Sequence, residues 1–212
     1  IKLALYGTTN TLPSTSQQTH YVYNNKGLLR YTVDALGYVT ESRYNGLGQV
    51  IETINHPNKI SVLGNEVDTS TAVYGSATGT TPSTLAKRTR MVYDRLGQVR
   101  YVIDSLNVAI EKEYDSLGRL SREISYPFSI SIPSILSEAA VSTAINTAKN
   151  LAANINAVVS DKTYRYDVYN RVQEEVSAVS QRLKNGLLEA GRSVTGYSYD
   201  AFDRVVAKTE GV

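Results

Sequence analysis

The sequence predicts a mainly β fold in which antiparallel hairpins form a ribbon that is interrupted by one amphipathic helix. A four-residue phrase that starts with Asp or Asn and ends with Gly, Asn or Asp occurs eight times in the 212 residues. The segments between neighbouring copies alternate apolar and polar residues, as strands with one buried face do. The chain also contains 16 Tyr against 2 Phe and no Trp, and Tyr is favoured on half-buried sheets.

The repeated phrase has the chemistry of a tight turn. Asp or Asn at the first place can accept a backbone N–H, and Gly, Asn or Asp at the fourth place tolerate a left-handed backbone. Together they predict a type I turn that is closed by a left-handed residue and a bulge. The eight copies are Asn24–Gly27, Asp34–Gly37, Asn45–Gly48, Asp94–Gly97, Asp104–Asn107, Asp115–Gly118, Asp167–Asn170 and Asp200–Asp203.

The spacing of the turns predicts short strands. The residues that precede successive turns lie 10 residues apart from position 23 to 33 and 11 apart from 33 to 44, and the same steps recur from 93 through 103 to 114. Without the turns, strands of about six or seven residues remain, close to the commonest length. Between two turns Leu29, Tyr31 and Val33 alternate with Arg30 and Thr32. Each 21-residue repeat is therefore predicted to be one hairpin that pairs with the next.

Two insertions interrupt this spacing in what we predict to be a single strip over residues 1–212. The first, at about residues 58–90, is rich in Gly, Ser and Thr, and it predicts an exposed loop with room for one degenerate hairpin. The second, at about residues 128–162, predicts a helix. Residues 173–192 fit either a strand pair or a short helix followed by a strand, with Asn185–Gly186 as a turn.

Apolar residues in the second insertion follow a helical period. They occur at positions 141, 145, 148, 152, 155 and 159, and these steps of three and four place them on one helical face. Ser134 is expected to open the helix as its N-cap. One interpretation is a docking or membrane-contacting helix. We favour an amphipathic insert that lies on the sheet, because Lys149 and the asparagines at 146, 150, 154 and 156 oppose insertion into a bilayer.

The phrases resemble the YD-repeat, or Rhs, family, whose core is Tyr-Asp-x-x-Gly-Arg-Leu followed by a second Asp-x-x-Gly turn. Tyr114–Leu120 matches that core fully, and Tyr93–Val99 is close to it. The two last copies keep Tyr-Asp and the arginine but replace the glycine by Asn170 and Asp203. The residues that define the repeat are Tyr23, Gly27, Asp34, Gly37, Tyr44, Gly48, Tyr93, Asp94, Gly97, Asp104, Asn107, Tyr114, Asp115, Gly118, Arg119, Tyr166, Asp167, Asn170, Arg171, Tyr199, Asp200, Asp203 and Arg204.

The resemblance implies a structural function. Repeats of this family form β-strips that spiral into a hollow shell, which in bacterial toxin complexes and Rhs effectors encloses a toxic C-terminal domain. It implies a secreted or cell-surface bacterial protein. Its expected partners are an enclosed toxin and the rest of a longer polypeptide. We expect the longer polypeptide because the sequence starts at Ile1 and not at Met. Animal teneurins use a related shell in adhesion. The family's aspartate self-cleavage site has no matching Asp-Pro-x-Gly here, so neither protease nor toxin is carried over.

A second hypothesis from another class remains open. The regularly spaced tyrosines, flanked by Arg and Asn, could stack on sugars, which would make the chain a surface adhesin or carbohydrate-binding module. The simpler interpretation, which we favour, is that the rings pack across strands and hold the ribbon together.

Catalytic and metal sites are not predicted. Each turn carries about one carboxylate, whereas calcium needs several within one loop. His20 and His56 have no metal-ligand spacing, and no Gly-x-Ser-x-Gly or phosphate-binding loop occurs. We therefore expect no enzyme activity, no metal and no cofactor.

Composition excludes further classes. The net charge of +2, with both signs spread evenly, disfavours nucleic-acid binding. The absence of Cys excludes disulfides and thiolate metal sites. No apolar run reaches the roughly 18 residues that a membrane helix needs.

Overall fold

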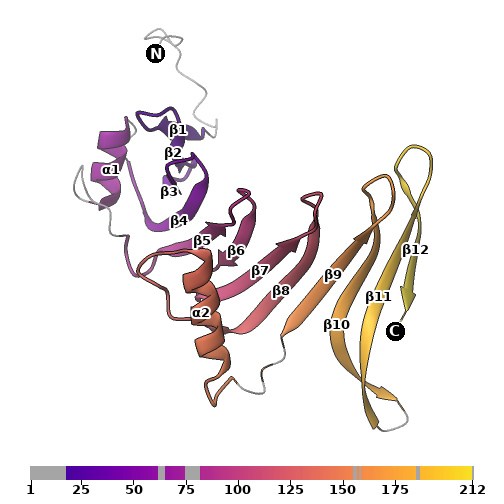
Figure 1. Cartoon of the computed structure of the whole chain (residues 1–212). Coiled ribbons are helices and arrows are strands. Elements are labelled where there is room, and N and C mark those ends of the chain that lie inside the picture. The colour runs from indigo at the N-terminus through magenta and orange to yellow at the C-terminus, as the bar shows by residue number, and fades with distance from the viewer. Residues whose placement is uncertain are drawn as a thin grey trace. The chain divides into compact units, whose positions relative to one another are not determined.

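The computed structural model describes residues 18–61, 65–74, 82–154, 157, 159–184 and 187–211, without the side chains of residues 67 and 178–191. This part of the chain forms 12 β-strands and two short helices (Figure 1), which confirms the mainly β fold built from antiparallel hairpins. Contacts divide the chain into two compact units, residues 1–87 and 88–212. Each unit is described separately, and a single strip over all residues stays a prediction.

The first unit contains four strands and one helix. Its elements are β1 (His20–Tyr23), β2 (Leu29–Val33), β3 (Tyr38–Tyr44), β4 (Val50–Lys59) and α1 (Glu66–Tyr74). The strands pair antiparallel in the order of the sequence. The second unit repeats this plan and then extends it. Its elements are β5 (Lys87–Tyr93), β6 (Val99–Ile103), β7 (Val108–Tyr114), β8 (Leu120–Ser129), α2 (Glu138–Lys149), β9 (Ser160–Tyr166), β10 (Val172–Lys184), β11 (Leu187–Tyr199) and β12 (Val205–Gly211).

In the second unit, too, each strand pairs antiparallel with the next one in the sequence. The residues before the repeated turns end strands, as predicted, and at six of the eight turns the second residue after the turn begins a strand. The hairpins of the sequence are therefore the hairpins of the fold. Residues 172–199 form the strand pair β10–β11, which settles the open alternative; the predicted turn at 185–186 lies outside the described residues.

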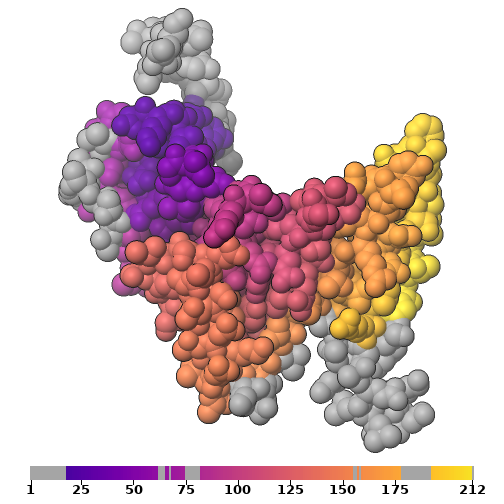
Figure 2. Space-filling view, in the orientation of Figure 1, coloured from indigo at the N-terminus to yellow at the C-terminus, as the bar shows by residue number. Residues whose placement is uncertain are grey.

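The predicted alternation sets the core of each unit. Tyr31 and Val33 are each only 1% exposed and pack with Val22 and Val39 in the first unit. In the second unit Tyr101 and Ile103 take the same places, and α2 adds its own buried face to that core. Figure 2 shows the segment that contains α2 as a raised block on the second unit.

The helix α2 is shorter than its apolar period predicted. Its buried residues Val141, Ile145 and Ala148 lie on the predicted face, and their packing against the sheet confirms an insert that lies on it. The N-cap is Ser137, not Ser134: Ser137 has an extended backbone, and its Oγ accepts the N–H of Ala140 at 3.2 Å.

The helix ends at Lys149, because the asparagines that follow cap it. Asn150 is its C-cap, and the side-chain amide of Asn154 donates to the carbonyl oxygen of Ala148 at 2.9 Å. The apolar positions 152 and 159 lie beyond the helix, and position 155 lies outside the described residues.

The first insertion contains a helix where the sequence predicted a loop. Asn65 caps α1: its Oδ1 accepts the N–H of Asp68, and the Asp68 carboxylate accepts the N–H of Asn65. Sequence periodicity missed this helix because it is short, and its buried face is polar, with Thr69 and Ser70 facing inward. Residues 75–81 of the predicted loop lie outside the described residues.

The long strands β4 and β8 each carry a proline where the ladder is interrupted. Between the pairs Asn55–Thr40 and Lys59–Tyr38 three residues of β4, Pro57 among them, face a single residue of β3. A proline lacks the N–H that a regular ladder requires, so it fits only at such a bulge. The strand β8 repeats this irregularity around Pro127.

No helix in the described residues is long and apolar enough to cross a membrane.

Truncation of Ile145, a buried side chain of α2, is expected to destabilise the second unit. Ile145→Ala removes a side chain that is 3% exposed, and we expect a loss of about 2–4 kcal/mol in the free energy of unfolding, measured by urea titration. Ile135→Ala is the matched control, because Ile135 is 77% exposed, and it should cost less than about 0.5 kcal/mol. Equal losses in the two variants would show that α2 does not anchor the core.

Candidate functional site

The repeat-defining residues build eight closed turns. At each turn the fourth residue has positive φ, as predicted: five glycines at +76° to +89°, and Asn107, Asn170 and Asp203 at +61° to +65°. The N–H of this fourth residue donates to the carbonyl oxygen of the first at 2.9–3.2 Å. The first residue in turn donates its N–H to the carbonyl oxygen one place beyond the turn. Each hairpin end is thereby locked by two backbone hydrogen bonds.

The side chain at the first place adds a second lock. One oxygen, Oδ1, accepts two backbone N–H groups in every turn, those of the third residue and of the residue after the turn. At Asp115 these bonds are 2.9 Å each, and the N–H of Arg119 is the main cause that lowers the pKa of the carboxyl below its usual value. Asn serves as well as Asp here, because a neutral amide oxygen offers the same acceptor.

Tyrosines that precede the turns tie each strand to the one before it. A Tyr at the end of one strand donates its hydroxyl to the carbonyl oxygen of the residue that begins the preceding strand. These bonds are Tyr44 to Leu29 at 2.6 Å, Tyr114 to Val99 at 2.9 Å, Tyr166 to Leu120 at 2.8 Å and Tyr199 to Val172 at 2.6 Å. Burial raises the pKa of Tyr114 and of Tyr166, so both hydroxyls stay protonated and able to donate.

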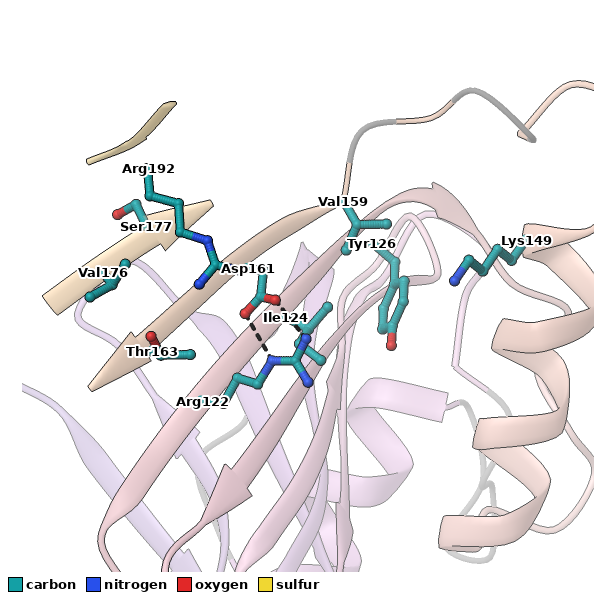
Figure 3. A pocket seen from close by; sticks show the side chains of 10 residues that line it. All are labelled: Arg122, Ile124, Tyr126, Lys149, Val159, Asp161, Thr163, Val176, Ser177 and Arg192. Atoms are coloured by element: carbon teal, nitrogen blue, oxygen red, sulfur yellow. Dashed lines mark hydrogen bonds and ion pairs between the residues drawn. The ribbon is translucent and has the colours of Figure 1, made fainter. Parts of the chain in front are cut away.

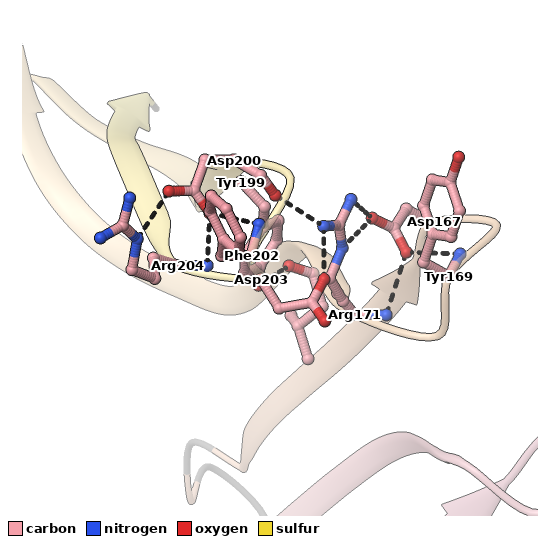
Figure 4. A network of polar contacts seen from close by, with 9 residues as sticks. Asp167, Tyr169, Arg171, Tyr199, Asp200, Phe202, Asp203 and Arg204 are labelled. Carbon is pink, nitrogen blue, oxygen red and sulfur yellow. Dashed lines mark hydrogen bonds and ion pairs between the residues drawn. The ribbon is translucent and has the colours of Figure 1, made fainter.

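Side chains after the turns connect successive turns along one edge of the second unit. The guanidinium of Arg119 donates from Nε to Asp115 in its own turn at 2.7 Å and from Nη1 to Asn170 in the next at 2.8 Å. It also lies 4.5 Å from the ring centroid of Tyr166. Arg171 repeats all three contacts, with Asp167 of its own turn and with Asp203 and Tyr199 at the following turn (Figure 4). This edge is therefore joined through side chains as well as through backbone pairing.

Three of the eight turns lack a glycine at the fourth place, and the arginine contacts just described, called the arginine ladder below, explain two of them. Asn170 and Asp203 each stand at a left-handed position that glycine takes with less strain. Each supplies a side-chain oxygen at 2.8 Å to the arginine of the preceding turn. Where the preceding turn is followed by Gln98, its amide donates instead to the backbone oxygen of Gly118 at 3.0 Å, and no side-chain acceptor is needed.

A buried carboxylate, missed by sequence reasoning, lies in the first unit. Glu41 is 0% exposed, and its oxygens are bonded by Arg30 at 2.6 Å, Arg43 at 2.8 Å and His56 Nε2 at 3.0 Å. The hydroxyl of Tyr74, on α1, donates to it as well. Desolvation would raise the pKa of Glu41, but the hydrogen bonds of His56, Arg43 and Tyr74 outweigh it and lower the pKa to about 2. The cluster joins β2, β3, β4 and α1.

The second unit has an equivalent glutamate, Glu111, which lies 70 positions after Glu41 in the sequence. Arg100 pairs with it at 2.5 Å, and Tyr126, which replaces His56, donates its hydroxyl at 2.5 Å. Burial is the largest cause that raises the pKa of Tyr126, and the bond to Glu111 adds to it. The signal that could have found both clusters was the 70-residue offset between the two units, in which Arg-Tyr and Glu recur at equivalent places.

The structure does not bring the repeat-defining residues together at one point. They lie along the strand ends, one turn to each hairpin, and their polar atoms are used within or between turns. Among the residues that the structure describes, no three His, Asp or Glu side chains are grouped so that they could hold a metal ion. Of the two histidines, His56 pairs with Glu41. The arrangement fixes strand register and holds strands together.

Two substitutions of Asp104 are expected to distinguish the role of its carboxylate as a hydrogen-bond acceptor from the role of its charge. Asp104→Ala leaves the N–H groups of Leu106 and Val108 without their acceptor, and should lower the free energy of unfolding by about 1–2 kcal/mol. Asp104→Asn keeps an oxygen at that place, as in the turns at Asn24 and Asn45, and should retain most of the stability. Denaturant titration compares the two. A loss as large in the Asn variant would mean that charge, not the acceptor, matters.

The first unit is expected to lose stability in acid. Because the pKa of Glu41 is about 2 in the folded chain and about 4.5 when unfolded, the unfolded state binds the proton more readily. The contribution is complete above pH 4.5 and disappears as the pH falls toward 2. Hydrogen exchange of residues 29–59 measured over this range should show faster opening. Glu41→Gln should flatten the dependence and cost about 3–5 kcal/mol at neutral pH. Glu174→Gln, in an exposed pair with Arg165, is the control and should leave the dependence unchanged.

Comparisons with known proteins add a likeness of fold. No protein-family model and no curated protein matches the chain. A crystal structure of TcdB2-TccC3 without its hypervariable C-terminal region is similar with a TM-score of 0.53 at 16% identity, over 94% of this chain and 7% of that one. The complex TcdB2-TccC3-Cdc42 has a TM-score of 0.42 at 14% identity, over 92% and 9% of the two chains. The chain thus spans under a tenth of these proteins. It shares the fold of a segment of TcdB2-TccC3.

Proposed function

We propose that the chain is a structural, non-catalytic segment of a wall that encloses a toxin or effector domain of a longer bacterial polypeptide. In this proposal the polypeptide is secreted or displayed at the cell surface. The observation that carries it is the ladder along the strand ends, where tyrosine hydroxyls and arginines of one hairpin bond to the next. These side-chain hydrogen bonds perform no chemical reaction. They link neighbouring strands, and a wall requires that its strands stay together.

The ladder suits containment because it strengthens the sheet against separation of neighbouring strands. Strands separate when the backbone hydrogen bonds between them break, and the strand ends fray first. Here the ends are held by the turn locks and by guanidinium groups that each contact two turns. Each exposed ion pair contributes only about 0–1 kcal/mol, so the resistance comes from repetition. The likeness of fold to a segment of TcdB2-TccC3 supports this proposal.

The adhesin or carbohydrate-binding hypothesis has less support at the tyrosines that contact the arginine ladder, Tyr166 and Tyr199. The rings of Tyr166 and Tyr199 are each covered on one side by a guanidinium, and their hydroxyls donate to backbone oxygens. A sugar would have to displace the arginines to stack on those covered faces. A glycan array probed with the chain tests this hypothesis, and saturable binding that is lost in Tyr166→Ala would favour it over containment.

Weakening the ladder is expected to open the wall. In the natural polypeptide that carries this chain, Arg119→Ala with Arg171→Ala should expose the enclosed domain to a protease about ten times faster, with the chain still folded by circular dichroism. Arg95→Ala with Arg165→Ala removes the same charge from exposed positions and should change the rate less than about twofold. A downstream domain that is cleaved equally fast in the unaltered protein and in both variants would refute containment.

A further inference from the structure

A cleft in the second unit has no role in the wall described above. It lies between the last turn of α2 and the strands β8–β11 and has a volume of about 620 Å³ (Figure 3). Its lining is Arg122, Ile124, Tyr126, Lys149, Val159, Asp161, Thr163, Val176, Ser177 and Arg192. Three of these side chains are cationic and one is anionic, so the cleft carries an excess of positive charge.

The single carboxylate of the cleft is already occupied. Arg122 donates from Nε and Nη2 to the two oxygens of Asp161 at 2.9 and 2.6 Å, a bidentate pair between β8 and β9. This bond is the main cause that lowers the pKa of Asp161 and raises that of Arg122, so both groups stay charged. Arg192 also helps to lower the pKa of Asp161 through its charge, so this one carboxylate faces two arginines and the cleft keeps an excess of positive charge.

Lys149 and Arg192 are the two cations of the cleft that lie outside this bidentate pair. Figure 3 shows them on different walls, Lys149 on α2 and Arg192 on β11. Within the described residues neither forms a hydrogen bond or ion pair, and both are exposed. Lys149 has one local reason for its place, because a cation in the last turn stabilises a helix. That reason does not apply to Arg192, which lies on a strand and faces the same cleft.

The rest of the lining is apolar. Ile124 is 7% exposed and Tyr126 is 9% exposed, and Val159 and Val176 are half-buried beside them. The Tyr126 hydroxyl is used by Glu111, so its ring rather than its polar atom is offered to a ligand. A site for a polyanion such as nucleic acid would have many cations and a polar floor. Two separate cations around apolar side chains instead suit carboxylates that flank an aliphatic residue.

We propose that this cleft binds a short acidic peptide segment, with Lys149 and Arg192 pairing its carboxylates and an aliphatic side chain lying against Ile124 and Tyr126. The inference goes beyond the proposed wall function and does not depend on it. The unit 70 residues earlier supplies a contrast from the same fold. There Glu52 stands in place of Arg122 and His56 in place of Tyr126, so the position equivalent to Arg122 carries the opposite charge. The arginine of the bidentate pair in this cleft therefore has no counterpart at the equivalent position of the first unit.

The test is fluorescence anisotropy of the whole chain with a labelled peptide Gly-Asp-Leu-Glu-Gly. We expect saturable binding at about 0.05 M salt that weakens at about 0.5 M, where surface charges are screened. Lys149→Ala with Arg192→Ala should weaken binding about tenfold. Arg165→Ala with Lys208→Ala is the matched control, because it removes two exposed cations elsewhere in the unit, and it should change affinity less than about twofold.

Three outcomes would overturn the inference. The first is equal binding of the neutral peptide Gly-Asn-Leu-Gln-Gly, which would show that carboxylates are not recognised. The second is an equal loss in the cleft and control variants, which would reduce the effect to net charge. The third is binding of a sulfated disaccharide to the cleft without binding of the peptide. Circular dichroism of each variant ensures that a loss of binding is not a loss of fold. The binding measurement does not depend on the result of the protease test, because the peptide is titrated into the isolated chain.

Discussion

One oxygen atom in each turn determines the geometry on which the remaining structure depends. The Oδ1 of an Asp or Asn accepts two backbone N–H groups, and a left-handed residue three places later closes the turn. Together they fix which residues face each other in the hairpin. A slip by one residue would turn every side chain to the other face of the sheet. The burial of Tyr31 and Tyr101, the inward carboxylates and the tyrosine bonds to the preceding strand all require that the slip does not occur.

The two units show which features this geometry requires and which it leaves free. Both keep an arginine next to a buried tyrosine and place a glutamate across from that tyrosine, at Tyr31–Glu41 and Tyr101–Glu111. The neighbouring cross-strand pair is reversed: Arg43 pairs with Glu52 at 3.2 Å in the first unit, and in the second Glu113 faces Arg122 at 3.8 Å. Opposite charge across the strands is what the register requires, and either order satisfies it. The reversal also gives the second unit an arginine that can pair with β9.

The sequence could predict the strands, the turns and the buried face of α2 because each depends on residues within about ten positions of one another. The turn at Asp115 is readable from its own letters, and so is the alternation around Tyr101. The carboxylate clusters were not predicted, because Glu41 meets His56 and Tyr74 only after β3, β4 and α1 are in place. Local signals also compete: Ser134 and Ser137 are both serines that suit an N-cap, and the structure uses the second.

The exchange of glycine for Asn170 and Asp203 shows how a local rule yields to a longer-range one. Read in isolation, these residues weaken the turn, since a side chain at positive φ costs free energy that glycine avoids. Their oxygens are acceptors for arginines that lie 51 and 32 positions earlier in the chain. The local cost is therefore offset by a bond between hairpins. Because each bond joins only neighbouring turns, stability accumulates as a sum of nearest-neighbour contributions, as in repeat proteins. A strip built this way lengthens by adding further hairpins, without redesign of those already present.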